Sequence, residues 1–157
     1  MMVLYAYNEA LMRAPFEDRE VWKDWPVLLE RAHIQAEANV GFVDRYRGED
    51  DPLGYIAPRW PAEPLIMGNL SAWTNLRSLY DYTFGAGTHG GMVKHRTRWF
   101  EPWPFDRPHF VAWWGRAEIT QDDKIVCDFD LDTAMLMQAQ LGQHGPNANV
   151  FGWSGPR

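Results

Sequence analysis

The segment "PLIMGNLSAWTNLRSLYDYTF" (residues 64–84) decides the fold class that we expect for this chain. Residues 64–73 are apolar on both faces except at two positions, which predicts a strand buried within a sheet. Residues 74–84 repeat apolar side chains at three- and four-residue steps, the period of an amphipathic helix. The segment therefore predicts a strand followed directly by a helix with one apolar side.

Side chains alternate across a strand, so the two polar positions of residues 64–73 can be assigned to a face. Asn69 and Ser71 share one face with Met67 and Trp73. We expect this face to contribute Asn69 and Ser71 as hydrogen-bonding groups and Trp73 as an apolar wall of a ligand pocket.

Strands and helices continue on both sides of this segment. We expect further strands at residues 2–8, 39–48, 109–114 and 149–153, and further helices at residues 17–36, 88–100 and 130–145. Asp18 is expected to cap the first helix, and Pro26 to kink or restart it. The order strand, helix, strand, strand, helix, strand, with a further helix and strand appended, predicts a ferredoxin-like α+β fold. Its antiparallel sheet would carry helices on one face only.

The strands at residues 64–73 and 109–114 are apolar on both faces, so the second face of the sheet also needs a cover. A homodimer in which two such sheets stack would supply that cover and enclose a cavity. A length of 157 residues suits one domain, and we expect residues 1–157 to form it.

Composition limits the classes of partner and compartment. A net charge of −6 without a basic run argues against nucleic-acid binding. The single cysteine, Cys127, permits neither an internal disulfide nor a cysteine-rich zinc site, and the first residues lack the features of a signal peptide. No segment approaches membrane-spanning length, so we expect a cytoplasmic protein. Nine tryptophans indicate either an aromatic-lined cavity or an aromatic core.

Residues 48–63, "GEDDPLGYIAPRWPAE", combine prolines, glycines and acids without periodicity. Long loops of this kind often cover a binding site, which makes this one a candidate lid. In the strand before it, strict alternation places Arg45 on the face opposite Phe42. We expect Arg45 to steady an anionic group of a ligand.

The stretch "GAGTHGGMVKHRTRWF" (residues 85–100) carries the candidate chemistry. A helix from Thr88 to Phe100 would place His89 and Arg96, two turns apart, on the same side. A neutral imidazole can act as a general base, and a guanidinium can hold an oxyanion or carboxylate.

A structural interpretation of the same pair stays open. His89 could be a satisfied core or capping histidine, and Arg96 could pair with an acid such as Asp44. Met92, on the same side of this helix, and Trp113, in the strand at residues 109–114, would add apolar contacts to the ligand. His89 and His95 lack the spacing that places two metal ligands on one helical face, so no metal site is expected.

The segments "GFVDRY", "NLSAW", "THGGMVKHRTRWF", "FVAWW" and "HGPNANVFGW" together resemble a bacterial family, domain of unknown function 3291, of the dimeric α/β-barrel superfamily. The resemblance covers nearly the whole chain and implies a ferredoxin-like protomer that dimerises. The superfamily includes cofactor-independent monooxygenases related to antibiotic biosynthesis, ring isomerases, and haem enzymes such as aldoxime dehydratases. Membership implies a fold and a pocket but not a reaction.

Three functions follow from these residues and from the resemblance. The first is a cofactor-independent, monooxygenase-like enzyme that acts on an aromatic or apolar small molecule in an enclosed cavity. Its catalytic residues would be His89 and Arg96, and its substrate-binding residues would be Arg45, Asn69, Ser71, Trp73, Met92 and Trp113. The second is a haem enzyme with His89 as the axial ligand. The third is a non-catalytic protein that binds a small ligand.

Overall fold

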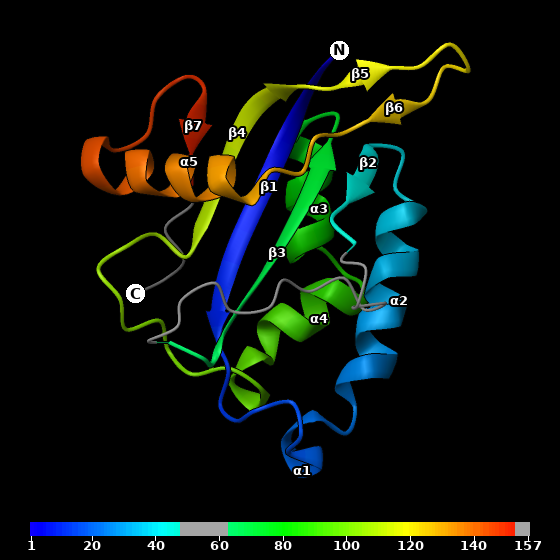
Figure 1. Ribbon diagram of the computed structural model, residues 1–157. Coiled ribbons are helices and arrows are strands. Elements are labelled where there is room, and N and C mark those ends of the chain that lie inside the picture. Colours follow the sequence, from blue (N-terminus) through cyan, green and yellow to red (C-terminus); the bar gives the residue numbers. More distant parts are fainter. Residues whose placement is uncertain (48–62, 153–157) are drawn as a thin grey trace.

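The computed structural model describes residues 1–47 and 63–152 (Figure 1). Its centre is a five-stranded sheet with the strand order β2-β3-β1-β4-β7, in which all neighbouring strands are antiparallel. The strands are β1 (Met2–Leu11), β2 (Phe42–Arg45), β3 (Ile66–Trp73), β4 (Phe110–Arg116) and β7 (Val150–Phe151). The first four follow the ferredoxin-like order, which confirms the α+β fold class.

Except for the end of α4, the helices begin and end near the positions that the sequence indicates. They are α1 (Arg19–Trp22), α2 (Trp25–Glu37), α3 (Leu76–Phe84), α4 (Thr88–Lys94) and α5 (Leu131–His144). Asp18 caps α1 by accepting hydrogen bonds from two backbone amides. Pro26 lies in the first turn of α2, where a missing amide hydrogen costs nothing, so the expected restart is confirmed. Asp130 caps α5, and Gly145 ends it with a φ of 73°.

Helices α2, α3 and α4 cover one face of the sheet (Figure 1). At one end of this face, Leu4 and Trp73 form an apolar cluster with Leu79 of α3. At the other end, Met67 packs with Met92 of α4 and with tryptophans from α1, α2 and the segment after α4. This layer buries the apolar side of each helix against the even-numbered residues of β1.

Helix α5 lies on the opposite face, which corrects the expectation of helices on one face only (Figure 1). There Tyr5 and Trp113 stack with their ring centroids 5.4 Å apart, and Phe129 meets Tyr5 edge-on. Ala134 and Leu141 of α5 pack into the same cluster. The second face is therefore covered within the chain, so an uncovered apolar face no longer argues for a homodimer.

Helix α4 ends at Lys94, whereas the sequence indicated a helix as far as Phe100. Phe100 forms a β-bridge with Met12 beyond the end of β1, and this pairing draws the chain away from the helical path. A short 3₁₀ turn, η1 (Arg96–Arg98), makes the transition. The pairing with Met12 thus removes Arg96 from the helical face that carries His89.

Several tryptophan side chains pack against one another in the core. Trp25 meets Trp22, Trp99 and Phe100 edge-on, with ring centroids between 5.2 and 5.4 Å apart. Trp99 is only 2% exposed. Of the two interpretations of the tryptophans, this region favours an aromatic core.

Three further findings concern the chain after β4, the candidate lid and the length of the helices. A hairpin of β5 (Glu118–Ile119) and β6 (Ile125–Val126) extends from the end of β4 and was not expected from the sequence (Figure 1). The candidate lid, residues 48–63, lies outside the described residues except for Glu63. Among the helices that the structure describes, none combines the length and apolarity that crossing a membrane requires.

Candidate functional site

A β-bulge in β2 decides where Arg45 lies. The register of β2 against β3 shifts between Phe42 and Asp44, so that Arg45 pairs with Ser71. Arg45 therefore faces the side of the sheet that α2 to α4 cover, as Phe42 does. This corrects the expectation of opposite faces, because a bulge adds one residue and reverses the alternation beyond it.

Two of the three guanidinium nitrogens of Arg45 have no acceptor among the described residues. Its Nε and Nη1 atoms are buried, and neither has a hydrogen-bond partner in the described part of the chain. The nearby acids are engaged by Arg47, which bonds Asp44 at 2.8 Å and Glu37 at 3.3 Å. Burial and the charge of Arg47 lower the pKa of Arg45, which still stays charged at neutral pH because arginine titrates far above it.

His89 lies in the first turn of α4 with its ring stacked on Tyr82 of α3, the centroids 4.3 Å apart. Burial lowers the pKa of His89 to about 4, although the backbone carbonyls of Thr83 and Tyr82 partly oppose the shift. Its Nδ1 atom is buried and has no hydrogen-bond partner among the described residues. The side chain is thus a neutral imidazole at physiological pH, and one of its nitrogens has no hydrogen-bond partner among the described residues.

His33 of α2 and Tyr82 connect the two preceding groups. The pKa of His33 is lowered to about 4, first by burial and then by the charges of Arg45, Arg47 and His89. The pKa of Tyr82 is raised by burial, against the opposing effect of Arg45, and its hydroxyl donates to the Ala32 carbonyl at 3.3 Å. Arg45, His33, Tyr82 and His89 are therefore close enough for their charges or rings to interact, and we call them the Arg45–His89 cluster.

The sheet contributes the expected polar face. Asn69 and Ser71 lie on the helix-covered side together with Trp73, as alternation predicts. Trp73 is 1% exposed and donates from Nε1 to Ser71 Oγ at 2.9 Å, so it belongs to the core. Asn69 is exposed and pairs across the sheet with Asn8, between the two apolar clusters of this face. This polar break shows that α2 and α4 leave part of the sheet open.

The other expected site residues are dispersed. Arg96 is exposed, and its charge reaches His109, whose pKa it lowers together with burial. Met92 is buried in the aromatic cluster around Trp25. Trp113 lies on the opposite face of the sheet, stacked on Tyr5. The structure thus brings His89, Arg45 and Ser71 to one side of the sheet but separates Arg96 and Trp113 from them.

The described partners of Asp44 are Arg45 and Arg47, not Arg96. Its carboxylate accepts from Arg47 and from the backbone amide of Arg45, both at 2.8 Å. An Arg96–Asp44 ion pair is therefore not formed among the residues that the structure describes.

The hollows beside the cluster are open grooves. One, of about 500 Å³, runs between α2 and β2 and is lined by His33 and Arg45, with Val27, Ile34 and Glu37 among its other walls. A second, of about 560 Å³, is lined by Phe84, Val93 and the glycines between them. These two are the best-formed hollows of the described residues, and the enclosed cavity expected from the sequence is not found among them.

The residues around His89 do not fit haem. One face of its ring is covered by Tyr82, and an axial ligand needs a flat apolar slot at its coordinating nitrogen. The adjacent groove instead carries Arg45 and two glutamates, Glu30 and Glu37. Within the described residues, no three His, Cys, Asp or Glu side chains gather closely enough to hold a metal ion.

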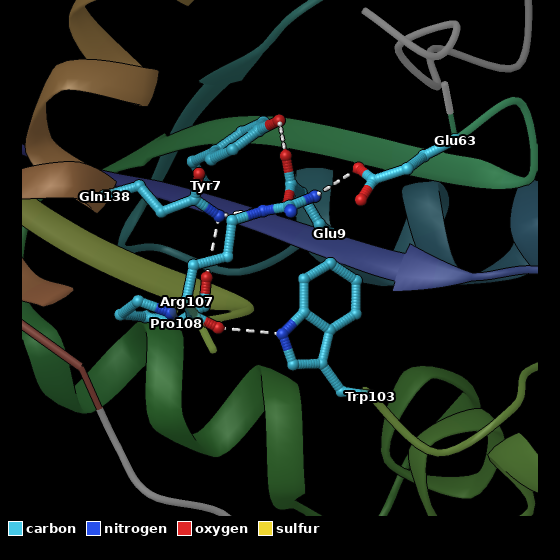
Figure 2. Close-up of polar contacts among 7 residues, drawn as sticks. All are labelled: Tyr7, Glu9, Glu63, Trp103, Arg107, Pro108 and Gln138. Atoms are coloured by element: carbon cyan, nitrogen blue, oxygen red, sulfur yellow. Dashed lines mark hydrogen bonds and ion pairs between the residues drawn. The ribbon is translucent and has the colours of Figure 1, made fainter. Parts of the chain in front are cut away.

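A second polar cluster lies on the other side of the sheet (Figure 2). Glu9, 2% exposed, accepts from Tyr7 at 2.9 Å, from Gln138 at 3.0 Å and from Arg107 at 3.1 Å. Arg107 also bonds Glu63 at 3.0 Å, so its side chain extends between two carboxylates, as Figure 2 shows. Because the described contacts already satisfy Glu9, we interpret this cluster as a clasp that joins β1, α5 and the segment before β4.

Two residues of the Arg45–His89 cluster, His33 and Tyr82, were not predicted from the sequence. His33 follows the buried Ala32 at the edge of the apolar stripe of α2, which is a weak signal for a partly buried histidine. Tyr82 was not predicted because α3 has three aromatic side chains within five residues; the other two, Tyr80 and Phe84, are 52% and 44% exposed. Helical periodicity alone did not fix which aromatic side chains turn inward.

The sequence was compared with protein families and with known proteins. A family model described as "Domain of unknown function (DUF3291)" matches residues 3–156. No curated protein matches the sequence. A solved structure of a conserved protein from Methanosarcina mazei Go1 is 11% identical, with a TM-score of 0.48, covering 74% of this chain and 93% of that one. A dabb family protein with a ferredoxin-like fold from Mesorhizobium loti is also 11% identical, with a TM-score of 0.44, covering 73% and 95% of the two chains.

Proposed function

We propose that this chain, which belongs to the family of domains of unknown function DUF3291, is a small-molecule enzyme with His89 as its general base and Arg45 as its anion-stabilising cation. The observation that carries the proposal is the pair of unsatisfied buried groups, His89 Nδ1 on one side and Arg45 Nε and Nη1 on the other. Buried polar groups without partners are rare in native structures and mark positions where a ligand completes the hydrogen bonding.

The chemistry follows from the charge state of each group. A neutral His89 accepts a proton from a C–H or O–H acid of the substrate and becomes an imidazolium. The electron pair stays on the substrate as an enolate or phenolate, and Arg45 stabilises that negative charge. Arg45 thereby carries alone the anion-stabilising role that the sequence had suggested for Arg45 and Arg96 together.

Within this reaction class we favour a cofactor-independent, monooxygenase-like step. The substrate anion reduces molecular oxygen, one oxygen atom bonds to the substrate carbon as a hydroperoxide that takes the proton from the His89 imidazolium, and loss of water then leaves a carbonyl group at that carbon. An electron-rich phenolate or enolate is the species that such a step requires. The aromatic and apolar surroundings of the cluster, with Tyr82 beside His89, support an aromatic or otherwise apolar substrate. We further propose that the protein acts as a cytoplasmic homodimer.

The first test is a screen of phenolic and 1,3-dicarbonyl compounds with an oxygen electrode and mass spectrometry of the products. We expect oxygen uptake with at least one compound and a loss of roughly 100-fold or more in rate for His89→Gln. His95→Gln is the matched control, because His95 is exposed immediately after the same helix.

The outcomes separate the alternatives. Full activity of His89→Gln would remove His89 from the mechanism. Conversion without oxygen uptake would leave the general base in place but reject the monooxygenase-like step. Tight binding without any product would identify a ligand-binding protein.

A further inference from the structure

The groove between α2 and β2 has chemistry that selects a class of ligand. Its inner wall is Arg45, whose buried Nε and Nη1 atoms lack acceptors among the described residues. Its outer wall is apolar: Val27 and Ile34, two turns apart on α2, are 52% and 60% exposed. The groove thus places unsatisfied donors at one position and bare hydrocarbon at another.

We propose that this groove binds an apolar monocarboxylate, with the carboxylate at Arg45 and the hydrocarbon along Val27 and Ile34. The inference deepens the proposed function and rests on it, because Arg45 serves both. A volume of about 500 Å³ accommodates a small ligand of this kind.

The charges around the groove favour a monoanion over a phosphate. Arg47 is already paired with Asp44 and Glu37. Glu30 adds another carboxylate to the rim. Arg45 is the only lysine or arginine among the described residues that line the groove, so a dianion would face these acids with one cation, whereas one carboxylate matches the donors that Arg45 offers.

His33 also lines the groove and is the second polar group that the ligand meets. Burial and the charge of Arg45 keep the pKa of His33 near 4, so the ring is neutral at physiological pH. A neutral imidazole donates one further hydrogen bond to a carboxylate oxygen without adding charge. The ligand therefore meets one cation, one neutral donor and an apolar wall.

The test uses the full chain and isothermal titration calorimetry at pH 7, with octanoate as the probe and 1-octanol, octylamine and phenyl phosphate as comparisons. We expect octanoate to bind at least about tenfold more tightly than each comparison compound. Arg45→Gln should weaken octanoate binding by at least about tenfold.

Ile34→Gln tests the apolar wall by changing a side chain that is 60% exposed. It should weaken octanoate binding several-fold, whereas Leu136→Gln, at an equally exposed position on α5, should not. Equal binding of octanol and octanoate, or unchanged binding by Arg45→Gln, would overturn the inference. If octanoate fails to bind while His89-dependent turnover of an uncharged phenol is observed, the carboxylate inference fails and the proposed function stands. If Arg45-dependent binding is observed and His89→Gln turns over substrate normally, the carboxylate inference stands and the proposed function fails.

Discussion

At the scale of the residue, the burial of His89 links the candidate site to the stability of the fold. Its pKa is about 4 in the folded protein, against about 6.5 for a free histidine. Between these two values the unfolded chain binds more protons than the folded one. The free energy of unfolding therefore falls as the pH decreases from about 6.5 towards 4, and is fully recovered above pH 6.5.

This dependence gives the first prediction. Between pH 7 and pH 4.5, the wild-type protein should lose about 2 kcal/mol more unfolding free energy than His89→Gln, because the variant has no imidazole to protonate. Urea unfolding at the two pH values measures the difference, with His95→Gln as the control. An equal loss in wild type and His89→Gln would mean that His89 is not held neutral by burial.

The second prediction concerns the coupling between His33 and Arg45. Arg45→Gln removes the second-largest cause of the lowered pKa of His33, so this pKa should rise. It should remain below 6.5, since burial is the largest cause and is unchanged. NMR titration of the imidazole protons measures the shift, and Arg13→Gln, at an exposed arginine outside this cluster, serves as the control. An unshifted His33 in Arg45→Gln would show that the two side chains do not form one cluster.

At the scale of the element, two glycines at the start of α4, Gly87 and Gly90, are required for close packing rather than for flexibility. A Cβ at Gly90 would overlap the carbonyl oxygen of Gly85, and one at Gly87 would overlap the side chain of Gln35. Gln35 in turn accepts from the backbone amide of His89 at 3.2 Å. These close contacts hold the start of α4 against α2 and thereby position His89.

Gly90→Ala and Gly91→Ala form a matched pair that tests this packing. Gly91 has open space where its Cβ would lie, so alanine there should stabilise the protein by roughly 0.5–1 kcal/mol through helix propensity. Gly90→Ala should instead destabilise it, because the start of α4 must move. Thermal and urea unfolding measure both changes; equal stabilisation by the two variants would contradict the packing argument.

The bulge in β2 determines the face of the sheet on which Arg45 lies. Without it, Arg45 would lie on the α5 side of the sheet, away from His33 and His89. Asp44, at the bulge, holds the local geometry by accepting from the amide of Arg45 and from Arg47. One extra residue in a four-residue strand thus determines whether the site has a cation.

At the scale of the whole molecule, the clasp around Glu9 joins segments that are far apart in the sequence. Arg107 pairs with Glu9, whose side chain is completely buried, and with Glu63. We predict that Arg107→Gln lowers the unfolding free energy by about 3 kcal/mol, since it leaves a buried carboxylate without its cation. Arg13→Gln, which breaks a half-exposed pair with Glu101, should cost less than about 1 kcal/mol. Similar losses in the two variants, measured by urea unfolding, would reject the clasp.

Assembly into a homodimer stays a prediction. Because α5 and Phe129 cover the second face of the sheet, a dimer would need a different surface from the one inferred from the sequence. Light scattering coupled to size-exclusion chromatography measures the assembly directly. A mass near 18.2 kDa at micromolar concentration would show a monomer.

The sequence by itself determined the order of the strands of the five-stranded sheet and of the helices that join them. Asp18 and Pro26 act within a few residues of their own position, so local chemistry fixes them. The shared face of Asn69 and Ser71 follows equally from the alternation of one strand. His89 was predicted as a site residue because a histidine within an otherwise apolar helical side stands out locally.

Only the tertiary structure decided which groups accompany His89. The bridge between Met12 and Phe100 ended α4 and removed Arg96, while the bulge brought Arg45 to the same side of the sheet. The position of α5 decided how the second face is covered. Each of these depends on pairing or packing between distant segments, whose free energy is not encoded in the periodicity of any one segment.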